Sequence, residues 1–107
     1  MIAYNVTINI DDEVHDQWLE WMKNEHLPMV MDTGKFLRYT MFRMLDKQDD
    51  ELGTTYSIQY IAPSIEDYEA YQENHAPLLQ AQTNKYFSGK FVAFRSIMQI
   101  EHSYEKI

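Results

Sequence analysis

The chain has 107 residues, of which 45% are hydrophobic and 14% aromatic, and its formal net charge is −8. This length and apolar content are typical of one domain with a packed core, so we expect a single domain over residues 1–107. Because 17 acidic residues outnumber 9 basic ones, nucleic acid and anionic membrane surfaces are not expected partners. The absence of cysteine excludes disulfides and thiolate metal sites.

No apolar run approaches the roughly 18 residues of a membrane span. The N-terminus has no basic segment of the kind that begins a signal peptide. We therefore expect a cytoplasmic protein that does not contact a membrane.

The first half of the chain predicts a strand, a helix and a second strand. Residues 2–10 alternate between apolar and polar or small side chains, which is typical of a strand with one buried face. Acidic residues at 11–13 begin a helical pattern that continues to about Met31 and ends at Gly34. Residues 35–45 show a strand pattern, and a polar loop follows over residues 47–51.

The second half repeats this order. A strand pattern covers residues 53–62, and Ser64 with Asp67 forms a capping box that begins a helix. This helix is expected to reach about Thr83, with an extension to Phe87, and to end at Gly89. Residues 91–101 show the pattern of a last strand, and residues 102–107 form a polar tail. The order βαββαβ predicts a ferredoxin-like α+β fold, a four-stranded antiparallel sheet with two helices on one face.

The two halves also share short sequence matches. Glu-His-Leu-Pro at 25–28 is echoed by Asn-His-Ala-Pro at 74–77, and Gly-Lys-Phe at 34–36 recurs at 89–91. Both matches occur in the same structural order, which suggests a duplication and makes His26 and His75 equivalent positions.

A helix with His-x-Pro, followed by a glycine and a hydrophobic strand, resembles the half-unit of the dimeric α+β barrel superfamily. That superfamily includes antibiotic-biosynthesis monooxygenase-like and ethyl-tert-butyl-ether-degradation-like proteins. The whole chain resembles more closely a bacterial family of about this length with no assigned function. The segments that match lie at 4–7, 15–22, 26–28, 33–36, 55–60, 76–79 and 91–95. The resemblance implies a ferredoxin-like domain that pairs into a dimeric α+β barrel.

Helical periodicity places both His26 and His75 on the faces that point toward the sheet. One hypothesis is a ligand pocket between helices and sheet, where these two candidate catalytic histidines bind or protonate a small molecule. Its predicted lining is Trp18, Met22, Glu25, His26, Tyr68, Tyr71 and His75. The alternative is that both are core histidines, hydrogen-bonded to a tyrosine, a glutamine or a carbonyl freed by a nearby proline.

A metal site has little support in the sequence. His15 and His26 are eleven residues apart on one helix, about 16 Å at ~1.5 Å per residue, so they cannot share an ion. His26, His75 and Glu25 could form a His-His-carboxylate set, but no spacing requires it. We predict no metal and no cofactor.

Haem is considered because haem-binding monooxygenases also occur in the superfamily. These enzymes resemble the chain in having an asparagine on the first strand, here Asn5, and a histidine on the second helix, here His75. They also need a tryptophan near the start of that helix, where this chain has Glu-Asp-Tyr at 66–68. Strand alternation turns Asn5 away from the helices, so haem degradation is not expected.

The last strand predicts an interface. Its even-numbered side chains are apolar apart from Ser96, so we expect them to face the helices and the odd-numbered ones to face away. A half-polar sheet face suits a second copy of the chain, and the predicted homodimer interface is Asn5, Thr7, Ser57, Gln59, Ile61, Phe91, Arg95 and Ile97. Arg95 then needs a carboxylate, backbone carbonyls or an anionic ligand. The acidic loop at 49–51 of the second copy is one candidate partner.

These observations leave several functions open. The chain is a protein of unknown function whose homodimeric barrel has a possible small-molecule pocket. It could act as a cofactor-independent monooxygenase or as an isomerase-like enzyme, or it could be a non-catalytic structural or regulatory module. The sequence has no Ser-His-Asp order and no glycine-rich phosphate-binding loop. It therefore gives no support to the reaction classes that depend on these two motifs.

Overall fold

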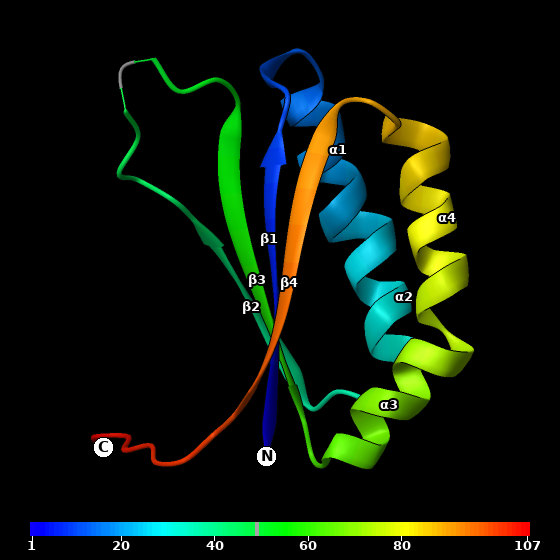
Figure 1. Cartoon of the computed structure of the whole chain (residues 1–107), viewed down its shortest axis with the longest axis vertical. Coiled ribbons are helices and arrows are strands. Elements are labelled where there is room, and N and C mark those ends of the chain that lie inside the picture. The colour runs from blue at the N-terminus through cyan, green and yellow to red at the C-terminus, as the bar shows by residue number, and fades with distance from the viewer. Residues whose placement is uncertain (49) are drawn as a thin grey trace.

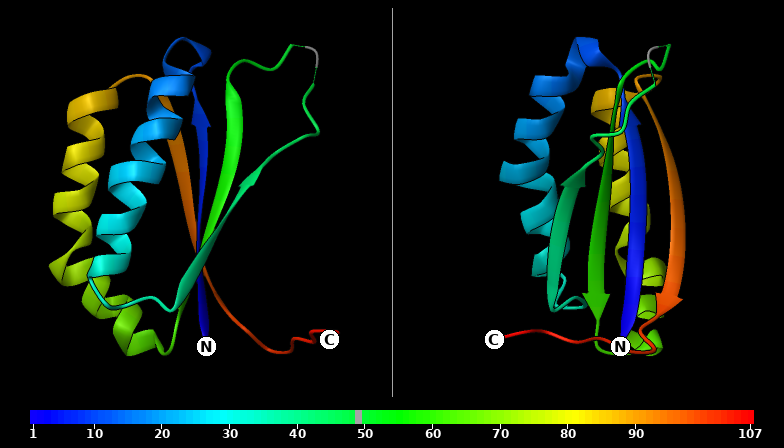
Figure 2. Two further views of the ribbon diagram at one scale, coloured as in Figure 1. Left: turned by 180° about the vertical axis from the view of Figure 1, so that it is seen from behind. Right: turned by 90° about the vertical axis from the view of Figure 1, so that its left-hand side faces the viewer.

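The computed structural model describes residues 1–48 and 50–107. Its sheet contains β1 (Ile2–Ile10), β2 (Arg38–Arg43), β3 (Thr54–Ala62) and β4 (Phe91–Gln99), paired antiparallel in the order β2-β3-β1-β4. The helices cover one face of this sheet (Figures 1 and 2). This is the ferredoxin-like arrangement, so the predicted fold class is confirmed.

The first helical region consists of η1 (Asp12–Val14), α1 (His15–Trp21), η2 (Met22–His26) and α2 (Leu27–Asp32). The η2 segment is a π turn, in which the N–H of Leu27 donates to the carbonyl of Met22. In a regular α-helix the ring of Pro28 would crowd the carbonyl four residues earlier. The wider turn avoids that clash and changes which side chains of this segment face the sheet.

The second helical region is divided where the sequence predicted one helix. Residues Ile65–Asn74 form α3 and Ala76–Phe87 form α4, with His75 between them at a non-helical φ of −127°. Pro77 fits the first turn of α4 because the amide hydrogen it lacks has no acceptor there. The predicted cap is confirmed, since the amide of Asp67 donates to Ser64 Oγ at 3.2 Å. None of the helices within residues 1–48 and 50–107 is long and apolar enough to cross a membrane.

The strand register corrects the predicted faces of β4. Arg95 pairs with Val6, Phe91 with Ile10 and Ile97 with Tyr4. Because Tyr4, Val6 and Ile10 are buried under the helices, the expected position of Phe91, Arg95 and Ile97 on the opposite face is wrong. The outward side chains of β4 are Val92, Phe94, Ser96 and Met98.

The prediction failed because β4 is an edge strand. Among the described strands it pairs only with β1, and the helices cover it incompletely: Phe91 and Ala93 are half-buried, while Arg95 and Ile97 are exposed. Its most apolar side is therefore free to face away from the helices. There Val92 is 58% exposed and Phe94 73% exposed.

An aromatic cluster fills the space between the central strands and the second helical region. Tyr4 and Tyr60 lie on β1 and β3, and their rings stack with centroids 5.8 Å apart. Phe36 and Tyr71 close the cluster, with ring centroids 4.8 Å apart. All four residues are buried, and three of them border the candidate site described next.

Candidate functional site

A cavity of about 50 Å³ lies between the helices and the sheet. It is much smaller than the roughly 300–1,000 Å³ of typical ligand pockets, so in this conformation it admits a group of only a few heavy atoms. Its sheet side is lined by Tyr4, Val6, Ile8, Ile58, Tyr60, Phe91, Ala93 and Arg95. Its helix side is lined by Met22, His26, Tyr71, Leu79, Gln80 and Thr83.

His26 is the titratable side chain that the π turn brings to this cavity. Its Nδ1 atom is buried and has no hydrogen-bond partner among the described residues. One face of the imidazole stacks on Trp21, with ring centroids 5.0 Å apart. Burial lowers the pKa of His26 from 6.5 to about 4. The imidazole is therefore neutral at physiological pH, and one ring nitrogen is free to accept a proton.

Three tyrosines with phenol hydroxyl groups also line the cavity: Tyr4, Tyr60 and Tyr71. Burial raises the pKa of Tyr60 and of Tyr71, and neighbouring tyrosines raise it further. Both phenols therefore stay protonated across the physiological range. They can donate hydrogen bonds to an oxygen atom placed in the cavity.

Arg95 brings a permanent positive charge to the same cavity. The side chain is exposed, so it lies where the cavity meets solvent. No carboxylate of the described residues lies within ion-pair distance of its guanidinium. Asp49 of the acidic loop, one of the expected partners, lies outside the described residues.

The structure brings only part of the predicted pocket together. Met22, His26 and Tyr71 line the cavity as one group. Trp18 is fully buried but does not line the cavity, and its ring centroid lies 5.1 Å from that of Tyr56. Tyr68 packs on the ring of a lining tyrosine, Tyr4, also at 5.1 Å, without lining the cavity itself.

The remaining two predicted residues lie elsewhere. Glu25 is exposed and lines a groove on the helix surface with Trp21 and Tyr86. His75 is half-buried at the break between α3 and α4, its ring 6.3 Å from that of Tyr71. It does not line the cavity, so His26 and His75 do not share one site.

The predicted pocket lining lacked five polar residues that the structure places there, Tyr4, Tyr60, Gln80, Thr83 and Arg95, although an anionic ligand was one of the partners expected for Arg95. Strand alternation could have found the first two, since both occupy the buried sides of their strands. For Arg95, the apolar pattern of β4 predicted the sheet face that points away from the helices, which is wrong.

The residues around this cavity do not fit haem. As expected, Asn5 faces away from the helices, where Ser57 Oγ donates to Asn5 Oδ1 at 2.7 Å and Asn5 Nδ2 donates to Thr7 Oγ1 at 3.1 Å. Asn5 and His75 therefore lie on opposite sides of the sheet. A cavity of about 50 Å³ is also far too small for a porphyrin.

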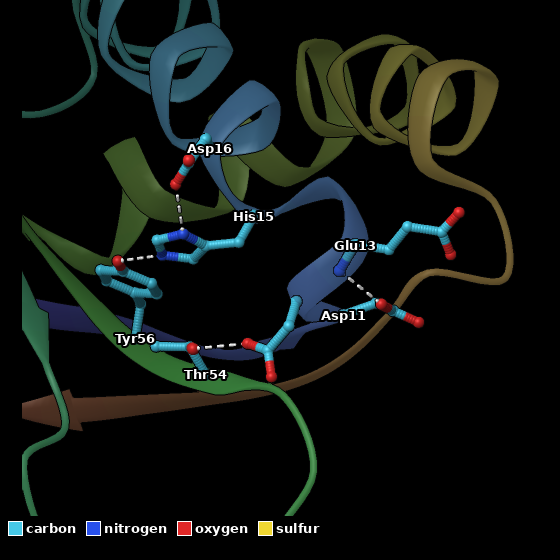
Figure 3. Close-up of polar contacts among 7 residues, drawn as sticks. Asp11, Glu13, His15, Asp16, Thr54 and Tyr56 are labelled. Carbon is cyan, nitrogen blue, oxygen red and sulfur yellow. Dashed lines mark hydrogen bonds and ion pairs between the residues drawn. The ribbon is translucent and has the colours of Figure 1, made fainter.

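A second polar cluster lies at the start of α1, apart from the cavity (Figure 3). His15 contacts Asp16 through Nδ1 at 2.9 Å and Tyr56 through Nε2 at 2.6 Å. The hydroxyl of Thr54 donates to Asp12 Oδ1 at 2.9 Å. These contacts join η1 and α1 to β3. Within the described residues, no three His, Asp or Glu side chains are grouped so that they could hold a metal ion.

Solved structures of the same shape come from several different proteins. A dimeric ferredoxin-like protein from an uncultured marine organism has a TM-score of 0.72 at 11% identity, covering 99% of this chain and 100% of that one. An ethyl tert-butyl ether degradation family protein from Bacillus halodurans gives 0.66 at 11% identity, covering 94% and 99%. The cofactor-independent oxygenase SnoaB from Streptomyces nogalater gives 0.71 at 9% identity, covering 98% and 97%.

At these identities the similarity demonstrates the shared ferredoxin-like fold alone. No functionally curated protein matches the sequence. One sequence family does match the chain, over residues 1–101. The chain thus belongs to the family described as a domain of unknown function, DUF4286.

Proposed function

We propose that the chain binds a small molecule in the cavity between helices and sheet, and that His26 transfers a proton to and from it. The observation behind this proposal is the buried, unpartnered Nδ1 of a neutral histidine on the cavity wall. Buried polar atoms usually have a hydrogen-bond partner, so such an exception suggests a group that a ligand completes.

The chemistry is the removal of a proton from a carbon next to a carbonyl group. The imidazole of His26 accepts the proton, and the electron pair of the broken C–H bond moves into the carbonyl as an enolate. The hydroxyls of Tyr60 and Tyr71 are suited to donate hydrogen bonds to the enolate oxygen. The imidazolium then returns a proton to carbon, which regenerates the starting compound or an isomer.

A second enzyme class begins with the same step. In a cofactor-independent monooxygenase, the carbanion formed by proton removal reacts with dioxygen, which is the oxidant. The shared fold of SnoaB supports keeping this alternative. Oxygen consumption during turnover separates it from an isomerase-like reaction. A non-catalytic module remains the third hypothesis, in which His26 only packs against Trp21.

The proposal includes a homodimer formed through the sheet face that the helices leave open. The side chains on this face combine exposed apolar groups with the polar groups of β1 and β3. They include Phe42, Val92, Phe94 and Met98 together with Asn5, Thr7, Ser57, Gln59 and Ile61. A second copy would cover these apolar groups, and a two-fold axis lets each copy use the same surface.

The test is solvent exchange into a simple carbon acid. Pyruvate and its neutral amide, pyruvamide, are incubated with the protein in D₂O, and deuterium incorporation into their methyl groups is followed by NMR. We expect the protein to accelerate exchange into at least one of the two probes, and His26→Gln to abolish the acceleration. His75→Gln is the matched control, because His75 lies outside the cavity and should leave exchange unchanged.

Two results would contradict the proposal. One is exchange that continues undiminished in His26→Gln. The other is the absence of any acceleration by a wild-type protein that is folded by circular dichroism.

A further inference from the structure

The charges around the cavity contrast with those of the whole chain. Acidic residues outnumber basic ones by 17 to 9 in the sequence, yet no aspartate or glutamate among the residues that the structure describes lines the cavity. The charged side chain among the lining residues is Arg95, since His26 is neutral there. The cavity therefore has a net positive charge in a protein whose overall charge is strongly negative.

The register of β4 directs this charge to the helix side of the sheet. Arg95 lies opposite Val6 of β1, whose buried side chain also lines the cavity. Its charge acts on the cavity wall, because it lowers the pKa of Tyr60 and of Tyr71 against the larger effect of burial. No acidic side chain of the described residues neutralises it.

We propose that the ligand of this cavity is a small carboxylate, held at the cavity mouth by the guanidinium of Arg95, with a carbonyl group beside its carboxylate and the C–H carbon beyond that carbonyl next to His26. This inference rests on the proposed function and adds the chemical class of the ligand to it. Arginine presents two parallel N–H groups that match both oxygens of a carboxylate. Because Arg95 is exposed at the cavity mouth, it is placed to bind the carboxylate end of a ligand whose other end lies inside the cavity.

The size of the cavity supports a short ligand. About 50 Å³ leaves room for only a few heavy atoms beyond the mouth. A three-carbon oxo acid satisfies this limit, with its carboxylate at Arg95, its carbonyl group within the tyrosine-lined part and its methyl carbon as the source of the proton.

An anionic ligand also improves His26 as a base. A group with a pKa of about 4 is a weak base at neutral pH, whereas efficient general bases have pKa values near the working pH. A carboxylate bound nearby raises the pKa of an imidazole by stabilising its protonated form. The ligand itself would thus bring His26 closer to the range in which it can accept a proton.

The experiment compares pyruvate with pyruvamide, which have nearly the same shape and differ in charge. Dissociation constants are measured by NMR titration of the wild type, Arg95→Met, Arg95→Gln and Arg38→Met. Arg38→Met is the matched control, because Arg38 is an exposed arginine on the opposite face of the same sheet. Circular dichroism melts establish that each variant is folded.

We expect the wild type to prefer pyruvate by about tenfold, the gain of a partly solvated charge-assisted pair. Arg95→Met and Arg95→Gln should bind both probes equally, and Arg38→Met should keep the preference. The inference is overturned if the wild type shows no preference, if either Arg95 variant keeps it, or if pyruvate does not bind at millimolar concentration.

Failure of this inference differs from failure of the proposed function. Equal deuterium exchange into both probes, still dependent on His26, would contradict the inference of an anionic ligand and would still support proton transfer by His26. Arg95-dependent binding of pyruvate without any His26-dependent exchange would leave a carboxylate-binding protein that is not an enzyme.

Discussion

The Nε2 atom of His15 lies 2.6 Å from the hydroxyl oxygen of Tyr56, and this contact fastens the start of α1 to β3 (Figure 3). The two rings stack with centroids 5.7 Å apart, and the ring of Trp18 also packs on Tyr56, with centroids 5.1 Å apart. Since Tyr56 itself is only 4% exposed, the hydrogen bond is largely shielded from water. The pair is therefore a structural contact that holds the helix layer on the sheet.

Removing this hydrogen bond should lower the stability of the fold. Tyr56→Phe leaves the ring packing intact and removes the partner of His15, so we expect a loss of about 1 kcal/mol in the free energy of unfolding. A double-mutant cycle with His15→Ala, measured by urea denaturation, should give a coupling energy of about 0.5–1.5 kcal/mol. Thr54→Val removes a more exposed hydrogen bond and serves as the control, with an expected change within about 0.5 kcal/mol. A coupling energy of zero would mean that the 2.6 Å contact contributes nothing to folding.

The buried histidine predicts how stability changes with pH. Burial lowers the pKa of His26 to about 4 in the folded state, below the value of 6.5 for a solvated histidine. The unfolded state therefore takes up this proton at higher pH than the folded state. The contribution of neutral His26 to the free energy of unfolding is fully present above pH 6.5. The free energy of unfolding then decreases as the pH drops from 6.5 toward 4, by up to about 3 kcal/mol.

His26→Gln tests this prediction because glutamine does not titrate. Urea denaturation between pH 7 and pH 4 should show a shallower loss of stability in His26→Gln than in the wild type. His102→Gln, in the exposed C-terminal tail, should follow the wild-type curve. Parallel curves for the wild type and His26→Gln would contradict the burial of a neutral imidazole.

Most of the fold was predictable from the sequence because local patterns determined it. Strand alternation over residues 2–10 and the Ser64 cap each correspond to a contact in the structure. A disturbance of the helix at Pro77 was expected, but the restart as a separate helix after His75 was not, because a proline within one helical period does not reveal whether the helix kinks or restarts. The π turn was missed as well, and it lies at His26.

The site was less predictable because it depends on which elements meet. Met22 and Tyr71 were found from helical periodicity, whereas Arg95 was assigned to the wrong face of β4. An alternation pattern gives two faces without saying which one the helices cover. On an incompletely covered edge strand, the more apolar face can be the open one.

Gly53 should tolerate no side chain. Its φ is 78°, and a Cβ atom there would lie 2.4 Å from Asn9 Oδ1 and 2.8 Å from the carbonyl oxygen of Ile10. Gly53→Ala should therefore lower the free energy of unfolding by about 2 kcal/mol or more, through backbone strain and this clash. Gly34→Ala is the control, with a similar φ of 75° and open space around the Cβ position. Thermal melts should show the larger loss of stability for Gly53→Ala. Equal losses of stability for the two variants would mean that the positive φ alone, and not the clash, causes the effect.

The open sheet face gives the last prediction, the proposed homodimer. Phe94 is 73% exposed and points away from the helices, so Phe94→Glu would bury a charge in the interface. Sedimentation should report about twice 12.8 kDa for the wild type and a shift toward the monomer for Phe94→Glu. Leu78→Glu is the matched control: it is 68% exposed on α4, on the helix side, and should leave the dimer intact. Arg95→Met should also leave the dimer intact, because the register turns Arg95 away from this face. A monomeric wild type at micromolar concentration would refute the dimer, and dissociation by Leu78→Glu but not by Phe94→Glu would move the interface to the helices.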